Sequence, residues 1–208
     1  MEKYPDRCID VGIAEGHSIA YAGGMGKPKK LKVVICIYSS FLQRAVDNIY
    51  HDVCVQDSPV IIAIDRAGLA AGDGITAQGL YDISFLNCIP NMIIAQPRNG
   101  HLMKELMQSA MKWNQPTAIR YPNLETTEYE KKIEHREVGK GEILELGKDV
   151  AIIALGHMYK IAKETRNLLL ENDIESYVID PIFLKPLDEN LFSEVLKNVQ
   201  IIVTIEEH

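Results

Sequence analysis

Short runs of β-branched apolar residues alternate with segments of helical periodicity, and this alternation limits the fold more than any other feature of the sequence. Such runs are typical of strands that are buried on both faces, as in parallel sheets covered by helices. Between two of them, Met103, Leu106, Met107, Ala110 and Met111 share one helical face, which predicts a helix packed on the core. In this first block we expect strands at residues 11–14, 33–38, 60–65, 92–95 and 117–121.

The same alternation returns after a polar stretch without periodicity at residues 123–140. In this second block we expect strands at 150–155, 176–179 and 201–205, a helix at 158–169, and a helix near 191–196 with Asp188 as its N-cap. The pattern predicts two α/β domains with parallel sheets, at residues 1–122 and 141–208, joined by a linker at 123–140. Because the sequence ends directly after an apolar strand, we expect the second domain to be truncated.

Charge and composition exclude several classes of function. A formal net charge of -7 argues against a nucleic-acid surface, which needs concentrated Lys and Arg. No apolar stretch approaches the ~20 residues that cross a bilayer, and the charged N-terminus begins no signal peptide, so we expect a cytoplasmic protein without membrane contact. The four cysteines lack metal-site spacing and are expected to be reduced core residues.

Glu15 is the first candidate for chemistry, because it follows the expected strand at 11–14. Ligands of open α/β sheets bind at the carboxyl ends of strands, and a partly desolvated carboxylate there could share a proton with a ligand nitrogen. A Glu that begins a helix explains the same position equally well, since a negative charge suits a helix N-terminus. The local pattern leaves both interpretations open.

Two further segments lie at expected strand ends. Residues 38–47 run from a strand into a helix and offer the aromatic ring of Tyr38 as a stacking surface, although packing and an ion pair between Arg44 and Asp47 explain them as well. Residues 65–79 are rich in glycine, which lets backbone approach a ligand, and Arg66 could pair with a phosphate or a carboxylate. A glycine-rich loop alone is weak evidence, and this one does not match the P-loop pattern.

These segments together resemble the 1-deoxy-D-xylulose-5-phosphate synthase family of thiamine-diphosphate enzymes. The resemblance covers nearly the whole chain and depends on five segments in this order: DVGIAE at 10–15, YSSFLQRA at 38–45, DRAG at 65–68, IRYP at 119–122 and KPLD at 185–188. Transketolase itself shares the fold and the glutamate but not the second segment in this form. The resemblance implies a pyrimidine-binding domain followed by an incomplete transketolase C-terminal domain.

The resemblance also implies a role for each matching residue. Glu15 would hold the proton on N1′ of the aminopyrimidine of thiamine diphosphate, and Phe41 would stack on that ring. Arg44 would position the group derived from pyruvate. The remaining site residues would face glyceraldehyde 3-phosphate, with the two arginines on its phosphate: Tyr38, Arg66, Asp73 and Arg120. The implied reaction joins pyruvate and the aldehyde with loss of carbon dioxide, for isoprenoid, thiamine and pyridoxal precursor synthesis.

Three departures from the family pattern affect the expected activity. Ala77 stands where the family has a histidine, and losing a positioned acid-base group commonly costs ~10²–10⁴ in rate. Gly16 stands where the family usually has Gln, which would loosen the turn after Glu15. The resemblance also implies an N-terminal diphosphate-binding domain, which we expect to be absent from this chain, so the magnesium ligands are expected from that domain and none is assigned here. We therefore expect the chain to be inactive alone.

Two alternatives remain. The chain could be the second subunit of a split transketolase-like enzyme, or a degenerate noncatalytic domain that binds a partner chain, an interpretation that Ala77 and Gly16 favour. In each case the surface normally covered by other domains predicts self-association, in the form of a homodimer.

Overall fold

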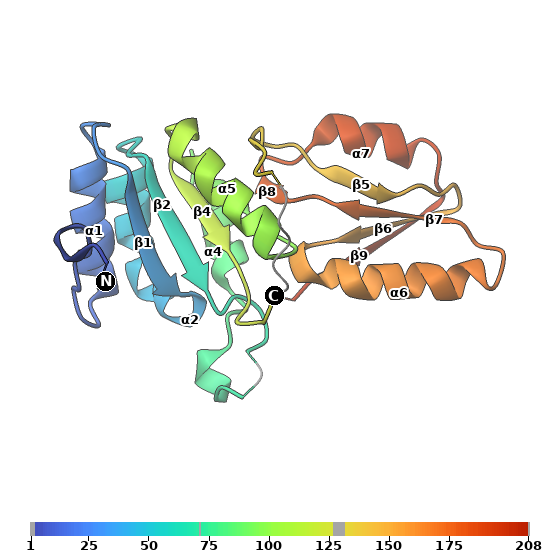
Figure 1. Cartoon of the computed structure of the whole chain (residues 1–208), viewed down its shortest axis with the longest axis horizontal. Helices are drawn as coiled ribbons and strands as arrows, with labels where there is room; N and C mark the ends of the chain where they lie inside the picture. Colours follow the sequence, from blue (N-terminus) through green and yellow to red (C-terminus); the bar gives the residue numbers. More distant parts are fainter. Residues whose placement is uncertain (1–2, 71, 127–131, 208) are drawn as a thin grey trace.

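The computed structural model describes residues 3–70, 72–126 and 132–207, and it confirms an α/β fold, with two sheets arranged along the long axis of the molecule (Figure 1). The first sheet has the strand order β1-β2-β4-β3-β8 and the second the order β5-β7-β6-β9. In each sheet one edge strand, β8 or β5, is antiparallel and the other strands are parallel.

The first sheet follows the apolar runs of the sequence. Its strands are β1 (Val33–Tyr38), β2 (Val60–Asp65), β3 (Ile93–Ala95), β4 (Thr117–Arg120) and β8 (Phe183–Lys185). Strand β2 is buried at five of its six positions because it lies between β1 and β4 with helices on both faces.

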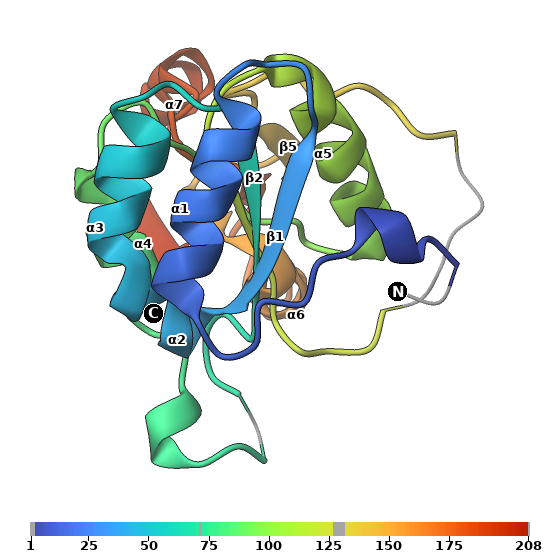
Figure 2. The same ribbon diagram turned by 90° about the vertical axis from the view of Figure 1, so that its left-hand side faces the viewer.

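Helices cover the two faces of this sheet unequally (Figure 2). On one face lie α1 (Glu15–Gly26), the helical run α2 (Ser39–Leu42), η2 (Gln43–Ala45), α3 (Val46–Asn48) and η3 (Ile49–Cys54), and α4 (Asp82–Cys88). The opposite face is covered by α5 (Gly100–Trp113), whose methionines pack against the core as predicted. No helix in the described ranges has the length and hydropathy needed to cross a bilayer.

The second sheet has a helix on each face. Its strands are β5 (Glu142–Glu145), β6 (Val150–Ala154), β7 (Ser176–Asp180) and β9 (Ile201–Ile205). Helix α6 (Tyr159–Leu170) packs on one face and α7 (Glu189–Leu196) on the other. The predicted N-cap is confirmed, because the Asp188 carboxylate accepts a hydrogen bond from the Leu191 amide at 3.2 Å.

The strand predicted at residues 11–14 is wrong. These residues form a loop in which the Gly12 amide donates to the Asp10 carboxylate at 2.8 Å, and Gly12 has a φ of +68°. They do not extend the first sheet, whose edge is β1, and they line a cavity instead.

The cysteine prediction is right for one residue and wrong for three. All four cysteines are free, and Cys54 is buried in the core as expected. Cys8, Cys36 and Cys88 are exposed. For Cys36 the reason is the strand alternation of β1, which turns it away from α1 and leaves it exposed.

Strand β8 was not predicted, and it ties the second half of the chain to the first. It pairs antiparallel with β3, so residues counted in the second domain complete the sheet of the first. The Lys185 ammonium then donates to the backbone oxygens of Asn87 and Ile89 at 2.8 and 2.7 Å. The two halves therefore share a sheet.

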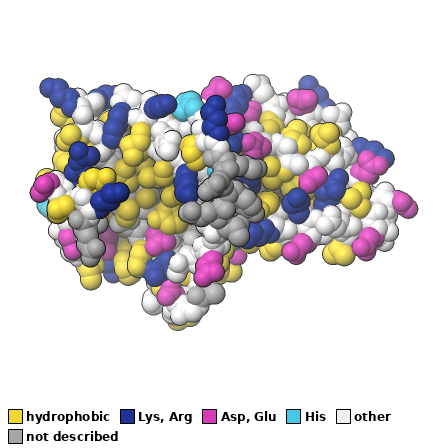
Figure 3. Space-filling view, viewed as in Figure 1, with side chains coloured by type: hydrophobic (Ala, Val, Ile, Leu, Met, Phe, Trp, Pro, Cys, Tyr) yellow, Lys and Arg dark blue, Asp and Glu magenta, His cyan; other side chains and the backbone are white. Residues whose placement is uncertain are grey.

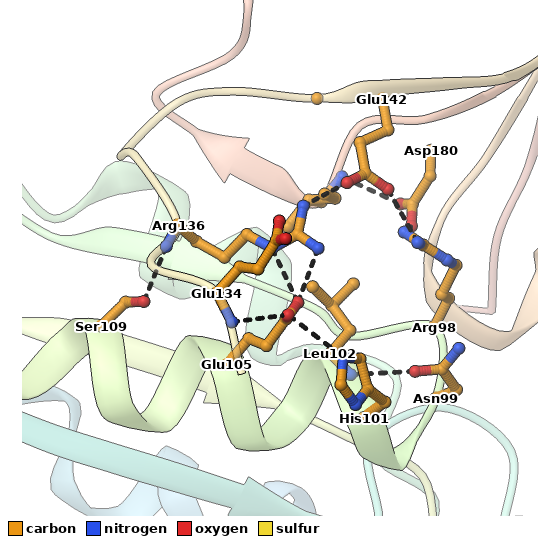
Figure 4. Close-up of polar contacts among 12 residues, drawn as sticks. Arg98, Asn99, His101, Leu102, Glu105, Ser109, Glu134, Arg136, Glu142 and Asp180 are labelled. Carbon is orange, nitrogen blue, oxygen red and sulfur yellow. Dashed lines mark hydrogen bonds and ion pairs between the residues drawn. The ribbon is translucent and has the colours of Figure 1, made fainter. Parts of the chain in front are cut away.

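An ionic network also joins the two halves (Figure 4). Arg98, which follows β3, contacts Asp180 at 2.8 Å and Glu142 at 2.7 Å, and both carboxylates belong to the second sheet. Arg136 pairs with Glu142 and, at 2.6 Å, with Glu105 of α5. The charges alternate in sign along this chain of contacts, which fixes the second sheet against α5.

The buried Asp180 gives a testable pH dependence. Burial raises the pKa of this carboxyl to about 6, although Arg98 opposes the shift. The folded protein therefore keeps its proton on Asp180 up to a higher pH than the unfolded chain does. The contribution of Asp180 to stability is present at pH 4 and is lost as pH rises through 6. We expect the stability of wild type relative to Asp180→Asn to fall by roughly 1–3 kcal/mol between pH 4.5 and 7.

Denaturant unfolding at several pH values measures this difference. Glu171→Gln, which removes an exposed carboxylate beyond α6, is the control and should follow wild type throughout. Parallel profiles for wild type and Asp180→Asn would contradict the assignment.

Candidate functional site

Glu15 is the first residue of α1, as the helix-start interpretation expects, and its role toward a ligand stays a prediction. Its N-cap, Ala14, supplies no side-chain hydrogen bond, and the carboxylate stands at the positive end of the helix dipole, where a negative charge is favoured. The side chain is only 10% exposed. A partly desolvated carboxylate at this place can hold a charge or share a proton with a ligand.

A cavity of about 220 Å³ lies beside Glu15. Its walls come from the loop before α1, from the start of α1 and from the end of β1: Val11, Gly12, Ile13, Ala14, Glu15, Ser18, Cys36, Ile37, Tyr38 and Phe41. Sites for whole ligands usually measure roughly 300–1,000 Å³, so this cavity matches one part of a larger molecule. Its lining is apolar apart from a few polar groups, which suits an aromatic ring that carries one hydrogen-bonding edge.

The turn from β1 into the following helices places an aromatic pair and an arginine at this cavity. The Tyr38 and Phe41 rings stack with centroids 5.6 Å apart. The Arg44 guanidinium lies 4.9 Å from the Phe41 ring and donates to the Glu15 carboxylate at 3.1 Å. Arg44 therefore compensates the charge of Glu15 from the solvent side, where its own side chain is 56% exposed.

Arg66 extends this set of contacts from the end of β2. Its guanidinium lies 4.0 Å from the Tyr38 ring, and its Nε is 3.2 Å from the Asp73 carboxylate. A hydrogen bond with Tyr38 raises the pKa of Arg66 above its ordinary value, and the charges of Asp73 and Asp65 add to this effect. The partly buried cation is thus held by a ring and a carboxylate, with donors left for an anion.

Six of the seven predicted site residues thus form one continuous set of contacts, from Glu15 to Asp73. Arg120 differs. It is 1% exposed, and it donates to both carboxylate oxygens of Asp82, at 2.8 and 3.1 Å, and to the Gln96 side chain. Its guanidinium therefore belongs to a buried ion pair. The sequence pattern did not indicate Asp82 or Gln96, which lie 38 and 24 residues from Arg120.

Residues 66–70 and 72–79 form a loop with a closed neck, which we call the site loop. At the neck the backbones of Gly68 and Gly79 exchange hydrogen bonds of 2.8 and 2.9 Å. Within the loop the Gln78 side chain accepts from the Ala70 amide at 2.8 Å. A Cβ at Gly79 would lie 2.3 Å from the Arg66 carbonyl oxygen, so this glycine permits the close approach that sets Arg66.

Gly16 and Ala77 are the two substituted positions among the departures from the family pattern, and the structure shows where each one lies. Gly16 packs against Asn48, and a Cβ there would lie 2.9 Å from the Asn48 side-chain oxygen. Any larger residue would displace Asn48, so glycine fits the local packing. Ala77 ends the short helix η4 (Ile75–Ala77) in the site loop.

Within the residues that the structure describes, no group of three His, Cys, Asp or Glu side chains lies close enough to hold a metal ion.

The face of β1 opposite α1 carries exposed apolar side chains. Val34 and Tyr38 are 38% and 39% exposed, and Cys36 between them is exposed too. In Figure 3 hydrophobic side chains gather over this part of the first sheet. An apolar area of this kind next to a candidate site is typical of a surface that another domain covers.

Family models match most of the chain. The transketolase pyrimidine-binding domain matches residues 1–128, and the transketolase C-terminal domain matches residues 139–208.

Curated relatives match the whole chain but extend well beyond it. It is 51% identical over 211 aligned residues to the 1-deoxy-D-xylulose-5-phosphate synthase of Chlamydia felis and 47% identical to that of Chlamydia pneumoniae. All of this chain is covered in both cases, and it spans 33% of the length of either relative.

Solved structures show the same arrangement. The chain of a structure described as "Split gene transketolase, inactive beta4 tetramer" matches with a TM-score of 0.89 and 29% identity, covering 100% of this chain and 67% of that one. A transketolase of Pichia stipitis matches in fold, with a TM-score of 0.70 and 16% identity, over 83% of this chain and 26% of that one.

Proposed function

The chain belongs to the transketolase family, of which it carries the pyrimidine-binding and C-terminal domains, and from this premise we propose that it forms the pyrimidine half of the thiamine-diphosphate site of a 1-deoxy-D-xylulose-5-phosphate synthase. The observation that carries the proposal is the position of Glu15. Its carboxylate is largely buried, lies at a helix N-terminus and lines an apolar cavity together with Tyr38 and Phe41. A small apolar cavity with one carboxylate suits an aminopyrimidine ring, which is aromatic and carries a basic nitrogen.

In this proposal the residues around the cavity bind and orient the cofactor. Thiamine diphosphate, when bound, supplies the carbon nucleophile that the reaction needs. Glu15 shares a proton with the ring nitrogen N1′, and Phe41 stacks on the ring. Arg44, which already pairs with Glu15 at 3.1 Å, positions pyruvate next to it.

The aldehyde substrate is assigned to the neighbouring residues. Tyr38, Arg66 and Asp73 face glyceraldehyde 3-phosphate, and Arg66 holds the phosphate, because its side chain is 24% exposed and has donors left. Arg120 could reach a phosphate only by releasing Gln96 or Asp82, so we assign it a supporting role behind the site.

The proposed reaction joins the two-carbon unit of pyruvate to the aldehyde with loss of carbon dioxide. Its product would serve isoprenoid, thiamine and pyridoxal precursor synthesis in the cytoplasm. Magnesium and the diphosphate would be held by a diphosphate-binding domain. The uncovered face of β1 is the surface where we propose that this domain or a second copy packs, as in a homodimer.

A noncatalytic partner-binding domain is the second candidate, because Ala77 places a methyl group where the family has a histidine. Gly16 gives this candidate less support, because it fits closely against Asn48. Restoring His at position 77 in the completed enzyme tests this candidate, which predicts no gain in turnover.

Calorimetric titration with thiamine diphosphate and magnesium tests the main proposal. We expect heat of binding when the chain is mixed with a diphosphate-binding domain of the family, and much weaker binding to either part alone. Phe41→Ala should weaken the binding, and Leu168→Ala, which truncates an exposed side chain on α6, should leave it unchanged. Equal binding by wild type and Phe41→Ala would contradict the proposal.

A further inference from the structure

Glu207, which follows β9 in the second half of the chain, reaches the site loop of the first half. The Leu69 amide donates to the Glu207 carboxylate at 3.3 Å, across 138 residues of sequence. Leu69 follows Gly68, whose backbone closes the neck of the loop with Gly79. One carboxylate from the second half thus contacts the loop that carries Arg66.

Gly68 permits this contact because it has no side chain. Its φ is +85°, which favours glycine, and a Cβ there would lie 2.8 Å from the Glu207 carboxylate oxygen and 3.2 Å from the Glu207 Cβ. Any side chain at this position would therefore push Glu207 away. The close approach depends on both residues.

His157 holds Glu207 from the other side. Its Nε2 lies 3.3 Å from the same carboxylate oxygen, and its side chain is 13% exposed. Burial lowers the pKa of His157; Glu207 opposes this shift, while Arg120 and Lys160 add to it. Its Nδ1 is buried without a hydrogen-bond partner in the part of the chain that is described, which fits a neutral ring donating from Nε2.

We propose that Glu207, held by His157, is a positioning residue that fastens the neck of the site loop and thereby sets the position of Arg66. Arg66 lies two residues before Gly68, and its carbonyl packs directly on Gly79 across the neck. A shift of the neck therefore moves the Arg66 backbone, which has a φ of +56° and little freedom of its own. The phosphate-binding role of the site loop rests on the proposed function, whereas the contact between Glu207 and Leu69 does not depend on it.

Amide hydrogen exchange of the intact chain tests the inference without any cofactor. In Glu207→Ala we expect the amides of Gly68, Leu69 and Gly79 to exchange roughly ten times faster, the effect of losing one hydrogen bond to a charged group. The amides of β2 should keep their rates. In Glu207→Gln the loop should regain most of its protection, because the side-chain oxygen can still accept from the Leu69 amide.

Glu164→Ala, which removes an exposed carboxylate from α6, is the matched control and should leave the loop unchanged. Unchanged loop exchange in Glu207→Ala would overturn the inference, as would equal acceleration in the Ala and Gln variants. If the loop loosens as expected but the chain never binds thiamine diphosphate with a diphosphate-binding domain, then the proposed function fails and the positioning contact stands.

Discussion

Replacing Glu15 by Gln is expected to lower turnover by roughly 10²–10⁴-fold in the enzyme completed with a diphosphate-binding domain. The amide of Gln fills the same space beside Phe41 but cannot take up a proton. The fold should survive, since Glu15 is a helix-start residue whose charge stabilises α1 by only about 0.3–1 kcal/mol. Steady-state turnover with pyruvate and glyceraldehyde 3-phosphate measures the effect.

Asp47→Asn provides the matched control for this variant. Asp47 is a carboxylate in the same helical run as Arg44, its side chain is 84% exposed, and it pairs with His51 rather than with the cavity. We expect turnover close to that of wild type. A Glu15→Gln enzyme within about threefold of wild type would contradict the assigned role, because general acid-base groups contribute far more than that.

Replacing Arg120 by Met is expected to lower the free energy of unfolding by about 3–5 kcal/mol. The reason is that its partner is buried: the Asp82 carboxylate is 0% exposed, and removing Arg120 leaves this buried charge without a cation. Thermal or denaturant unfolding of the chain measures the loss. The double variant Arg120→Met with Asp82→Leu should recover much of it, because the uncompensated charge is then gone.

This pair of variants separates a structural Arg120 from one that mainly binds substrate. A stability loss below about 1 kcal/mol in Arg120→Met, within the range of surface ion pairs, would contradict the structural role. In that case Arg120 would return to the set of residues facing the phosphate.

The strands that could be predicted from the sequence are those that coincide with a run of mainly apolar residues. Strands β1, β2 and β9 begin and end where their apolar runs do. Strand β5 was missed because its only two apolar residues stand between glutamates and none of its residues is buried. Strand β8 was missed because it is short and its partner, β3, belongs to the other half of the chain.

The site was predictable to the extent that its residues follow strands. Tyr38 and Arg66 end or follow β1 and β2, and parallel strands bring such residues to one edge of the sheet. Arg120 also ends a strand, but a distant carboxylate, Asp82, turns its guanidinium into the interior. The contact of Glu207 with the site loop depends on how the two halves pack, which no local pattern records.

The protonation of N1′ in the bound cofactor shows whether Glu15 acts on the aminopyrimidine ring. Thiamine diphosphate labelled with ¹⁵N at N1′ can be followed by NMR in the completed enzyme, with wild-type chain and with Glu15→Gln. We predict that N1′ gives the signal of a protonated ring nitrogen when bound to wild type, well above the pH at which the free cofactor loses that proton, and that Glu15→Gln abolishes this signal. The same N1′ signal in both proteins would contradict the account.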